Sequence, residues 1–328
     1  MAAVDPGDEV TFELRDARDG TLTRESTHAD LLSSDTLAHP LTGPLEVRGA
    51  EPGDVLAVDL IGYETDDFGW TGIWPGSGWL GDLFDRPFLA RWELDGDHAR
   101  SGDVPGVAVP AGVFAGVIGV APSPELFARV LEREESLAAA GAEFDLPDPS
   151  GAAPLAAATG LRTFPPRENG GNMDVRDLIA GSRLWLPVHQ PGALLSIGDL
   201  HFAQGDGEVC ISAIETGGTA TVRVDVRRGG WSPRFAAWEC PPRPGRRYFA
   251  TTGIPLHDDG TNADMDLNLA TRRALVEMLD WLQSERGMER EPAYVLMSAA
   301  VELRISELVD APNALVSAAM PLDVFVEG

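Results

Sequence analysis

The sequence of 328 residues carries 52 acidic and 25 basic side chains, which gives it a formal net charge of −27. This acidity argues against a nucleic-acid-binding protein, because affinity for phosphates comes largely from basic side chains, and equally against binding to an anionic membrane surface. Every basic residue is an arginine, so mechanisms that need a lysine as Schiff base, phosphate-loop ligand or general base are excluded.

Up to residue 160 the chain combines buried strands with one helix. Val55–Ile61 and Val113–Val120 are apolar runs, which predict strands buried on both faces. The charged, alanine-rich pattern of Pro122–Ala140 predicts a helix. The following stretch, Gly141–Gly160, is rich in proline, alanine and glycine, and we interpret it as a surface insertion or linker.

Four further strands are expected before residue 230. Leu184–Val188 and Leu194–Ile197 are again apolar throughout. In Ala220–Arg228 valines alternate with charged residues, which is typical of a half-buried strand. The two glycines of 216–219 separate this segment from Val209–Glu215, so we expect a β-hairpin between the two.

Helices are expected near the C-terminus. Met265–Arg286 places its leucines and a methionine on one face, and Gly287 is positioned to end that helix. A second helix is expected from about Arg290 to Ala300, with Pro292 in its first turn.

Strands before about residue 245 and helices after it predict an α+β fold dominated by strands. We expect a β-sandwich-like or barrel-like core over residues 1–245, with a helical and loop insertion at about 122–160. Residues 246–328 are expected to form an α+β C-terminal part that packs on this core.

The densest cluster of metal-binding side chains lies between residues 198 and 210. Asp199 and His201 are two residues apart after an apolar run, so on a strand both side chains point to the same face. Glu208 and Cys210 have the same spacing, and a turn through 203–207 would place them on the neighbouring strand. Such a set suits Zn²⁺ when histidine binds, or Ca²⁺ when oxygens predominate.

A glycine-rich segment upstream, Glu168–Asp174, offers further ligands. Gly171 allows the backbone to approach a ligand closely, and Asn172 and Asp174 carry side-chain oxygens. Turns capped by Asn and Asp have the same composition. Spacing alone therefore leaves two interpretations open, a metal site and a turn that precedes a hairpin.

Stretches along nearly the whole chain resemble the acetamidase/formamidase family. They are His39–Leu60, Gly116–Pro122, Gly170–Glu215, Ala250–Leu256 and Glu302–Phe325, and the longest reads GGNMDVRDLIAGSRLWLPVHQPGALLSIGDLHFAQGDGEVCISAIE. The resemblance implies a β-rich fold with an α+β C-terminal part. It also implies hydrolysis of short-chain amides to carboxylate and ammonia. The chain departs from the family at Glu302, where aspartate is common, and in a longer acidic stretch at 132–160.

The missing lysine agrees with this resemblance, because the family differs from the lysine-dependent Ser-Ser-Lys and nitrilase-type amidases. A divalent cation polarises an amide carbonyl and lowers the pKa of water from about 15.7 towards roughly 7, and a carboxylate then carries the proton to the leaving nitrogen. We expect zinc in preference to calcium. The expected metal ligands are Asp199, His201, Glu208 and His39, the expected catalytic carboxylates are Glu208, Asp199 and Asp174, and the expected substrate contacts are Asn172, Gly171 and Trp70.

Several of these roles have alternatives. Cys210 is a rival nucleophile, although its apolar surroundings at 209–213 predict a buried and inert thiol. His39 also fits a turn histidine without a metal, and Trp70 also fits an anchor for the glycine-rich loop 69–81. The chain as a whole could instead bind a small amide-like metabolite without hydrolysing it, around a structural metal.

The remaining expectations concern the setting of the protein. The N-terminus is acidic and lacks an apolar signal segment, and no apolar run reaches the roughly 18 residues that span a bilayer. Cys210 and Cys240 cannot build a disulfide framework. We therefore expect a cytoplasmic protein with a small-molecule amide as its partner. Edge strands in a β-rich chain favour a homo-oligomer, here a dimer.

Overall fold

The computed structural model describes residues 2–33, 38–78, 81–106, 108–142, 161–208, 210–243, 246–288, 293, 301–322 and 325. The strands are β1 (Ala2–Val4), β2 (Glu9–Leu14), β3 (Leu41–Val47), β4 (Val55–Ile73), β5 (Phe88–Leu94), β6 (His98–Arg100), β7 (Val109–Pro110), β8 (Phe114–Gly119), β9 (Gly170–Asn172), β10 (Arg183–Pro187), β11 (Leu195–Ala203), β12 (Ile214–Arg227), β13 (Ala237–Arg243), β14 (Arg246–Gly253), β15 (Glu302–Glu307) and β16 (Leu315–Pro321). The helices are α1 (Asp30–Ser33), α2 (Pro124–Ala139) and α3 (Leu267–Arg286), with a 3₁₀-helix η1 at Gly81–Leu83.

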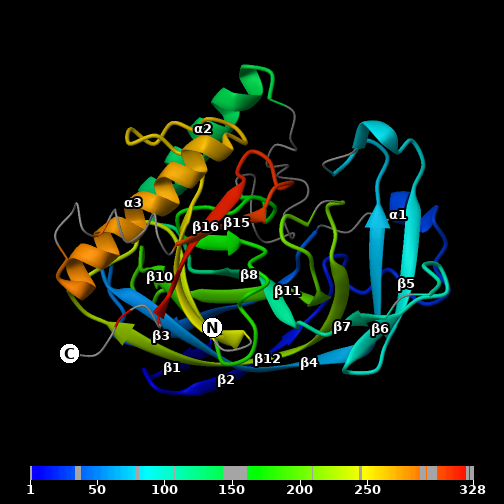
Figure 1. Ribbon diagram of the computed structural model, residues 1–328, viewed down its shortest axis with the longest axis horizontal. Coiled ribbons are helices and arrows are strands. Elements are labelled where there is room, and N and C mark those ends of the chain that lie inside the picture. The colour runs from blue at the N-terminus through cyan, green and yellow to red at the C-terminus, as the bar shows by residue number, and fades with distance from the viewer. Residues whose placement is uncertain are drawn as a thin grey trace.

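All of these strands join one large mixed sheet (Figure 1). Its central path runs β1-β3-β11-β12-β4-β10-β13-β14-β16-β15, while β2 pairs with β12, β5 with β4 and β8 with β11. The expected strand-dominated α+β fold is confirmed. The sheet does not close on itself, so the sandwich-like or barrel-like form is not confirmed.

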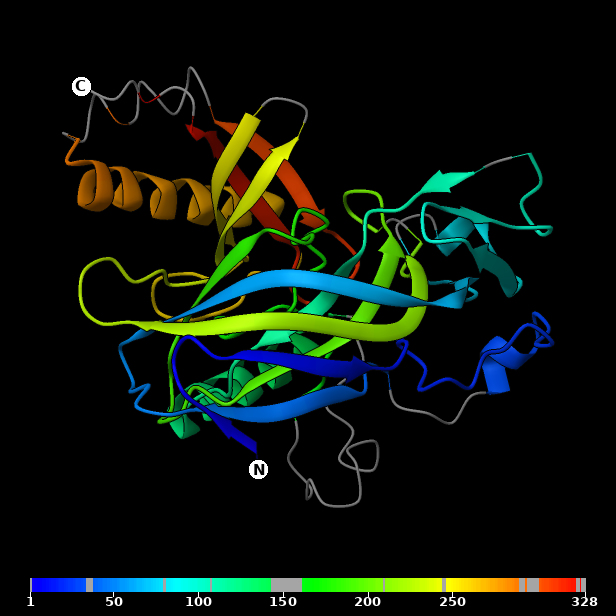
Figure 2. The same ribbon diagram turned by 90° about the horizontal axis from the view of Figure 1, so that it is seen from below.

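The long strands β4 and β12 lie side by side across the molecule (Figure 2). The expected hairpin at 216–219 is wrong, because β12 continues through both glycines. They form a bulge instead, where the register against β4 shifts between Thr216 and Gly218. At Gly218 (φ 151°) a Cβ atom would lie 2.0 Å from the carbonyl oxygen of Glu64, so this close approach requires glycine. The turn that reverses the chain lies earlier, between β11 and β12.

The helices begin and end where their capping residues predict. The side chain of Ser123 accepts a hydrogen bond from the backbone of Leu126 at the start of α2. Asp266 caps α3 in the same way, and Gly287 ends it in the left-handed conformation. The helix expected at 290–300 and the insertion expected at 141–160 lie almost entirely outside the described residues.

The two most extensive hydrophobic clusters of the described residues stabilise the sheet. The larger one is built from buried side chains of β4, β8, β10, β11 and β12, among them Leu56, Ile118 and Leu200. The smaller one lies beneath α3, which covers β14 and β16, and there the rings of Phe249 and Trp281 stack at 4.0 Å. Burial of such side chains contributes about 1.5–3 kcal/mol each.

The C-terminal strands continue the same sheet through β13 and β14. This hairpin spans the expected domain boundary at residue 245, and the division into two parts stays a prediction. In the described part of the chain, no helix combines the length and the apolar character that crossing a membrane requires.

Candidate active site

The candidate site is centred on β11, an interior strand that pairs with β3, β8 and β12. The expected placement of Asp199 and His201 on one face of a strand is found, since His201 Nε2 lies 3.3 Å from Asp199 Oδ1. Both side chains are buried, and the ring of Phe114 on β8 meets the imidazole edge-on. The imidazole is therefore held in a fixed position away from solvent.

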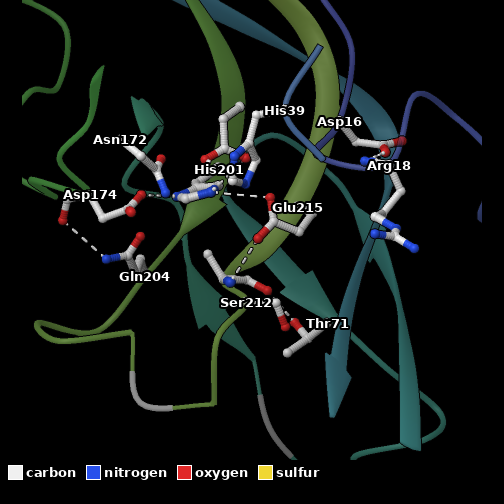
Figure 3. A network of polar contacts seen from close by, with 12 residues as sticks. Asp16, Arg18, His39, Thr71, Asn172, Asp174, His201, Gln204, Ser212 and Glu215 are labelled. Atoms are coloured by element: carbon white, nitrogen blue, oxygen red, sulfur yellow. Dashed lines mark hydrogen bonds and ion pairs between the residues drawn. The ribbon is translucent and has the colours of Figure 1, made fainter. Parts of the chain in front are cut away.

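Glu215 on β12 completes one side of this centre. It is the register partner of His201, and its Oε2 lies 3.1 Å from His201 Nε2 (Figure 3). Its other oxygen accepts a hydrogen bond from the backbone of Ala213. Sequence reasoning assigned no role to Glu215, because it placed Glu208 opposite His201. The apolar onset of β12 at Ile214 is the signal that would have found it.

Asp174 faces the other ring nitrogen, with its Oδ1 3.7 Å from His201 Nδ1. It follows β9, and its backbone is held at the carbonyl of Gly116 on β8. A Cβ atom at Gly116 would lie 2.4 Å from Asp174 Oδ1 and 2.6 Å from Asp199 Oδ2. This glycine is what lets the two carboxylates share one space beside the imidazole.

Glu208 joins the site from a turn and not from a strand. The expectation that Glu208 and Cys210 point the same way on the strand after β11 is wrong, because both lie in the irregular connection to β12. The backbone of Glu208 is held by hydrogen bonds to Gly205 and Ile211. Its carboxylate nevertheless reaches the site.

Among the described residues, two groups of buried side chains could hold a metal ion. One is Asp174, His201 and Glu208, and the other is Asp199, His201 and Glu215; in each group the ligand atoms lie within 4.8 Å of one another. Both imidazole nitrogens, Asp199 Oδ1 and Glu215 Oε2 are buried without a well-aligned hydrogen bond to any described residue. A cation would satisfy these atoms, so the donor set fits a divalent metal.

The buried charges shift one another's pKa values. Burial by itself lowers the pKa of His201, but Glu215 and Asp199 raise it well above the usual value. Burial raises the pKa of Asp174 and of Glu215 to about 7 each, and that of Glu208 well above its usual range. Burial also acts to raise the pKa of Asp199, but His201 and His39 hold it below the usual value. Neighbouring carboxyl groups thus favour different protonation states.

The site is also backbone-strained. Four of the expected site residues have positive φ angles, namely His39 (57°), Asp174 (48°), Asp199 (59°) and Glu208 (42°). Non-glycine residues rarely adopt this conformation, and when they do they gather at functional sites. The strain supports the choice of these residues.

The other expected site residues lie around the centre. His39 Nε2 is 3.9 Å from Asp199 Oδ2, and its Nδ1 contacts the hydroxyl of Thr163 at 3.1 Å. Asn172, on β9 next to Gly171, donates from Nδ2 to Asp310 at 2.5 Å. Their expected roles stay predictions.

Two placements from the sequence need correction. Trp70 lies within β4 as the register partner of Glu215, not in a glycine-rich loop, and it is only 1% exposed. Its role in substrate binding stays a prediction. Cys210 is partly exposed rather than buried in a strand, and its thiol donates to the carbonyl of Ser212 at 3.4 Å.

Glu168, at the start of the glycine-rich segment, forms an ion pair. Both of its oxygens accept hydrogen bonds from Arg133 on α2, at 2.6 and 2.8 Å. Next to it, Arg167 forms a second two-pronged pair with Glu134 of the same helix. These pairs attach the segment that leads to Asp174 to α2.

Two acidic residues from the C-terminal part reach the site without any local sequence signal. Glu307 and Asp310 are buried, and Asp310 binds Asn172. Burial raises the pKa of both well above the usual range, and Asp174 adds to the effect. Nothing in the neighbouring sequence places these two side chains beside Asp174, so only the tertiary structure shows their position.

A cavity of 510 Å³ adjoins the centre at Glu208. Its other walls come from the end of β11, the start of β12 and the strands β4, β5 and β7. The cavity connects the buried carboxylates with the outside and is large enough for a small organic molecule.

Comparison with known proteins gives consistent matches. The chain matches the Acetamidase/Formamidase family over residues 1–327. It is 34% identical to the acetamidase of Mycolicibacterium smegmatis over 91% of this chain and 82% of that protein, and 33% identical to the formamidase of Methylophilus methylotrophus over 99% and 86%. The crystal structure of an acetamidase from Bacillus halodurans superimposes with a TM-score of 0.76, at 27% identity over 99% of this chain and 92% of that one. This chain therefore belongs to the acetamidase/formamidase family.

Proposed function

We propose that this protein hydrolyses short-chain aliphatic amides, of the formamide and acetamide type, to a carboxylate and ammonia. The observation that carries the proposal is the buried centre at His201, with carboxylates facing both ring nitrogens, in a chain of this family. Its relatives are named acetamidase and formamidase, and the site offers the acid–base groups that amide cleavage needs.

We infer that the site holds a divalent cation, zinc in preference to calcium, because a histidine nitrogen is central to both ligand groups. The ligands would be Asp199, His201 and Glu208, with Glu215 added by the structure and His39 beside them. When bound, such an ion supplies polarisation of the amide carbonyl and a lowered pKa of water.

The residues of the site would have different roles in the reaction. Glu208 lies between the centre and the cavity, and its buried carboxyl group is suited to carry a proton to the departing nitrogen. Asp199 is kept ionised by His201 and His39, while Asp174 faces the opposite side of the imidazole. Asn172, Gly171 and Trp70 would contact the amide. Burial of these side chains keeps them out of bulk water, which strengthens the electrostatic interactions among them.

The test is release of ammonia from formamide and acetamide, measured for the protein as prepared, after chelation and after replenishment with Zn²⁺ or Ca²⁺. We expect turnover that is lost on chelation and restored by Zn²⁺. We expect Glu208→Gln and His201→Ala to lower kcat by about 100-fold or more, in line with loss of a general acid–base.

Glu51→Gln, which removes an exposed carboxylate far from the site, is the matched control and should leave kcat unchanged. Absence of turnover with any short amide would contradict the proposal and favour a binding protein. Full activity of Cys210→Ala is also expected, since the thiol points to the Ser212 carbonyl.

A further inference from the structure

The cavity beside the centre is larger than formamide or acetamide requires. Its volume of 510 Å³ falls within the range of about 300–1,000 Å³ in which proteins bind drug-sized ligands. Its lining is mostly apolar, and Glu208 forms part of the wall next to the carboxylate centre. An amide held at Glu208 would leave space for a longer acyl chain.

The wall away from the centre offers that chain an apolar surface. Trp92 and Ile214 are buried side chains of one hydrophobic cluster, and Val109 packs against them. The polar atoms there already have partners. Trp92 Nε1 donates to Thr71 at 3.0 Å, and the Thr71 hydroxyl donates to the carbonyl of Ala213 at 2.6 Å.

Gln204 lines the same cavity as Glu208. It is buried, and its Nε2 donates to the backbone carbonyl of Asp174 at 3.1 Å. Because a carbonyl oxygen only accepts, this bond orients the side-chain amide, and Oε1 must point away from that carbonyl.

The Oε1 atom of Gln204 is a buried acceptor without a hydrogen bond in the described part of the chain. Figure 3 shows it turned towards the space beside the Asp174 and His201 side chains. A buried acceptor without a donor is unfavourable, because it has lost its hydrogen bonds to water without replacement. A ligand with an N–H group would supply the donor.

We propose that the cavity selects primary amides with apolar acyl groups longer than acetyl, whose NH₂ group donates to Gln204 Oε1 while the acyl chain lies against Trp92, Val109 and Ile214. This assignment rests on the proposed amidase function and refines it. It makes Gln204 a specificity-determining residue, because a site built to bind an N–H rejects analogues that lack one.

Two ligands of nearly equal shape test the role of Gln204. Pentanamide and hexan-2-one share the carbonyl and the butyl chain, but the ketone has a methyl group in place of NH₂. Each is titrated as a competitor of formamide, with the release of formate as the readout, which hydrolysis of pentanamide does not produce. The measured quantity is the ratio of the two inhibition constants.

For the unaltered protein we expect the ketone to bind about tenfold more weakly than the amide, the usual effect of losing one buried hydrogen bond. Gln204→Met should bring this ratio close to one, because it should weaken the binding of the amide and leave the binding of the ketone unchanged. The matched control is Gln190→Met, because Gln190 also donates to a backbone carbonyl, that of Pro122, but lies outside the cavity. It should keep the ratio of the unaltered protein.

Val109→Trp tests the apolar wall in the same assay, by comparing pentanamide with acetamide. We expect the substitution to raise the inhibition constant of pentanamide by a factor about tenfold larger than that of acetamide, because the bulky side chain fills the acyl end of the cavity. An equal effect of Gln204→Met on amide and ketone, or of Val109→Trp on long and short amides, would overturn the proposal.

These outcomes are separate from failure of the amidase function itself. If formamide were not hydrolysed, that function would be wrong, and the same ratios would be measured as Kd values by calorimetry, where no turnover interferes. Equal Kd values for pentanamide and hexan-2-one would then overturn the assignment of Gln204 as well.

Discussion

At the scale of single residues, the site depends on conformations and contacts that few side chains tolerate. His39, Asp174, Asp199 and Glu208 all adopt positive φ angles, and each such residue costs of order 1–3 kcal/mol. Contacts with the surrounding sheet must therefore hold these residues in their unfavourable backbone conformations. Gly116 shows how tight the arrangement is, since it lies where Asp174 and Asp199 approach each other.

Gly116→Ala is therefore expected to lower kcat/KM for acetamide by about 100-fold or more, because a Cβ atom would displace both carboxylates. Ammonia release measures the activity, and circular dichroism checks the fold. Gly102→Ala is the control, since a Cβ there meets no atom within 4 Å. Near-normal activity of Gly116→Ala would show that the carboxylates need not lie this close to one another.

At the scale of elements, two features hold the site strands in place. The first is the bulge of β12. It shifts the register against β4, and β12 pairs with β4 on both sides of it. The second is the attachment of the segment before β9 to α2, through Arg133–Glu168 and Arg167–Glu134. Both features adjoin the candidate site, because the bulge follows Glu215 on β12 and the attached segment leads to Asp174.

Gly218→Ala should destabilise the protein by about 2 kcal/mol or more, because the added methyl group would overlap the Glu64 carbonyl and the φ angle of 151° disfavours alanine. Urea unfolding measures the change in the free energy of unfolding. Gly62→Ala, a position on β4 with open space around it, should change it by much less. Equal losses in the two variants would refute the bulge argument.

The pair on α2 predicts a dependence of stability on pH. Burial acts to raise the pKa of Glu168, but Arg133 holds it below the usual value. The pair therefore stabilises the fold above the pKa of the unfolded chain, and this contribution is lost as the pH falls through the lower pKa of the folded state.

Glu168→Gln should thus lower the free energy of unfolding at pH 7 by about 3 kcal/mol, since it leaves the buried Arg133 without a counter-charge. The difference from the unaltered protein should shrink below the usual glutamate pKa of about 4.3. Glu285→Gln, which removes the partner of the more exposed Arg227, should lower the free energy of unfolding by less than about 1 kcal/mol. A loss for Glu168→Gln that is independent of pH would contradict this account.

At the scale of the whole molecule, the site unites distant parts of one sheet. β8, β11, β12 and the segment after β9 supply the centre, and the turn that follows Glu307 at the end of β15 brings Asp310 against Asn172. Most of the remaining surplus of carboxylates lies elsewhere, on exposed positions of the chain. Those charges repel one another and act on the stability of the fold as a whole.

Added salt should therefore stabilise the protein. Raising NaCl from about 0.01 M to 0.15 M shortens the screening length from about 30 to 8 Å, which weakens the repulsion within a chain of charge −27. We expect Tm, measured by calorimetry at neutral pH, to rise. A fall in Tm over this range would mean that favourable ion pairs outweigh the repulsion.

Much of the local structure could be predicted from the sequence, because local interactions determine it. Alternation along β11 places Asp199 and His201 on one face, and caps at Ser123, Asp266 and Gly287 set the helix ends. The same rules misplaced Glu208 and Cys210, because the apolar residues at 209–213 fit a strand, whereas both side chains lie in the irregular connection before β12. The rules also predicted a hairpin at 216–219, because a pair of glycines fits a bulge as well as a turn, and the bulge depends on β4. The expected dimer and the cytoplasmic location stay predictions.

The family, the strand-rich fold, the central aspartate–histidine pair and the exclusion of lysine chemistry all follow from the amino-acid sequence. Three arrangements emerge only when the chain is folded: Glu215 faces His201, Glu168 pairs with Arg133, and two acids of the C-terminal part reach the site. The reason is physical. Periodicity and capping act between near neighbours in the chain, whereas these contacts depend on strand register and on the packing of segments far apart in sequence.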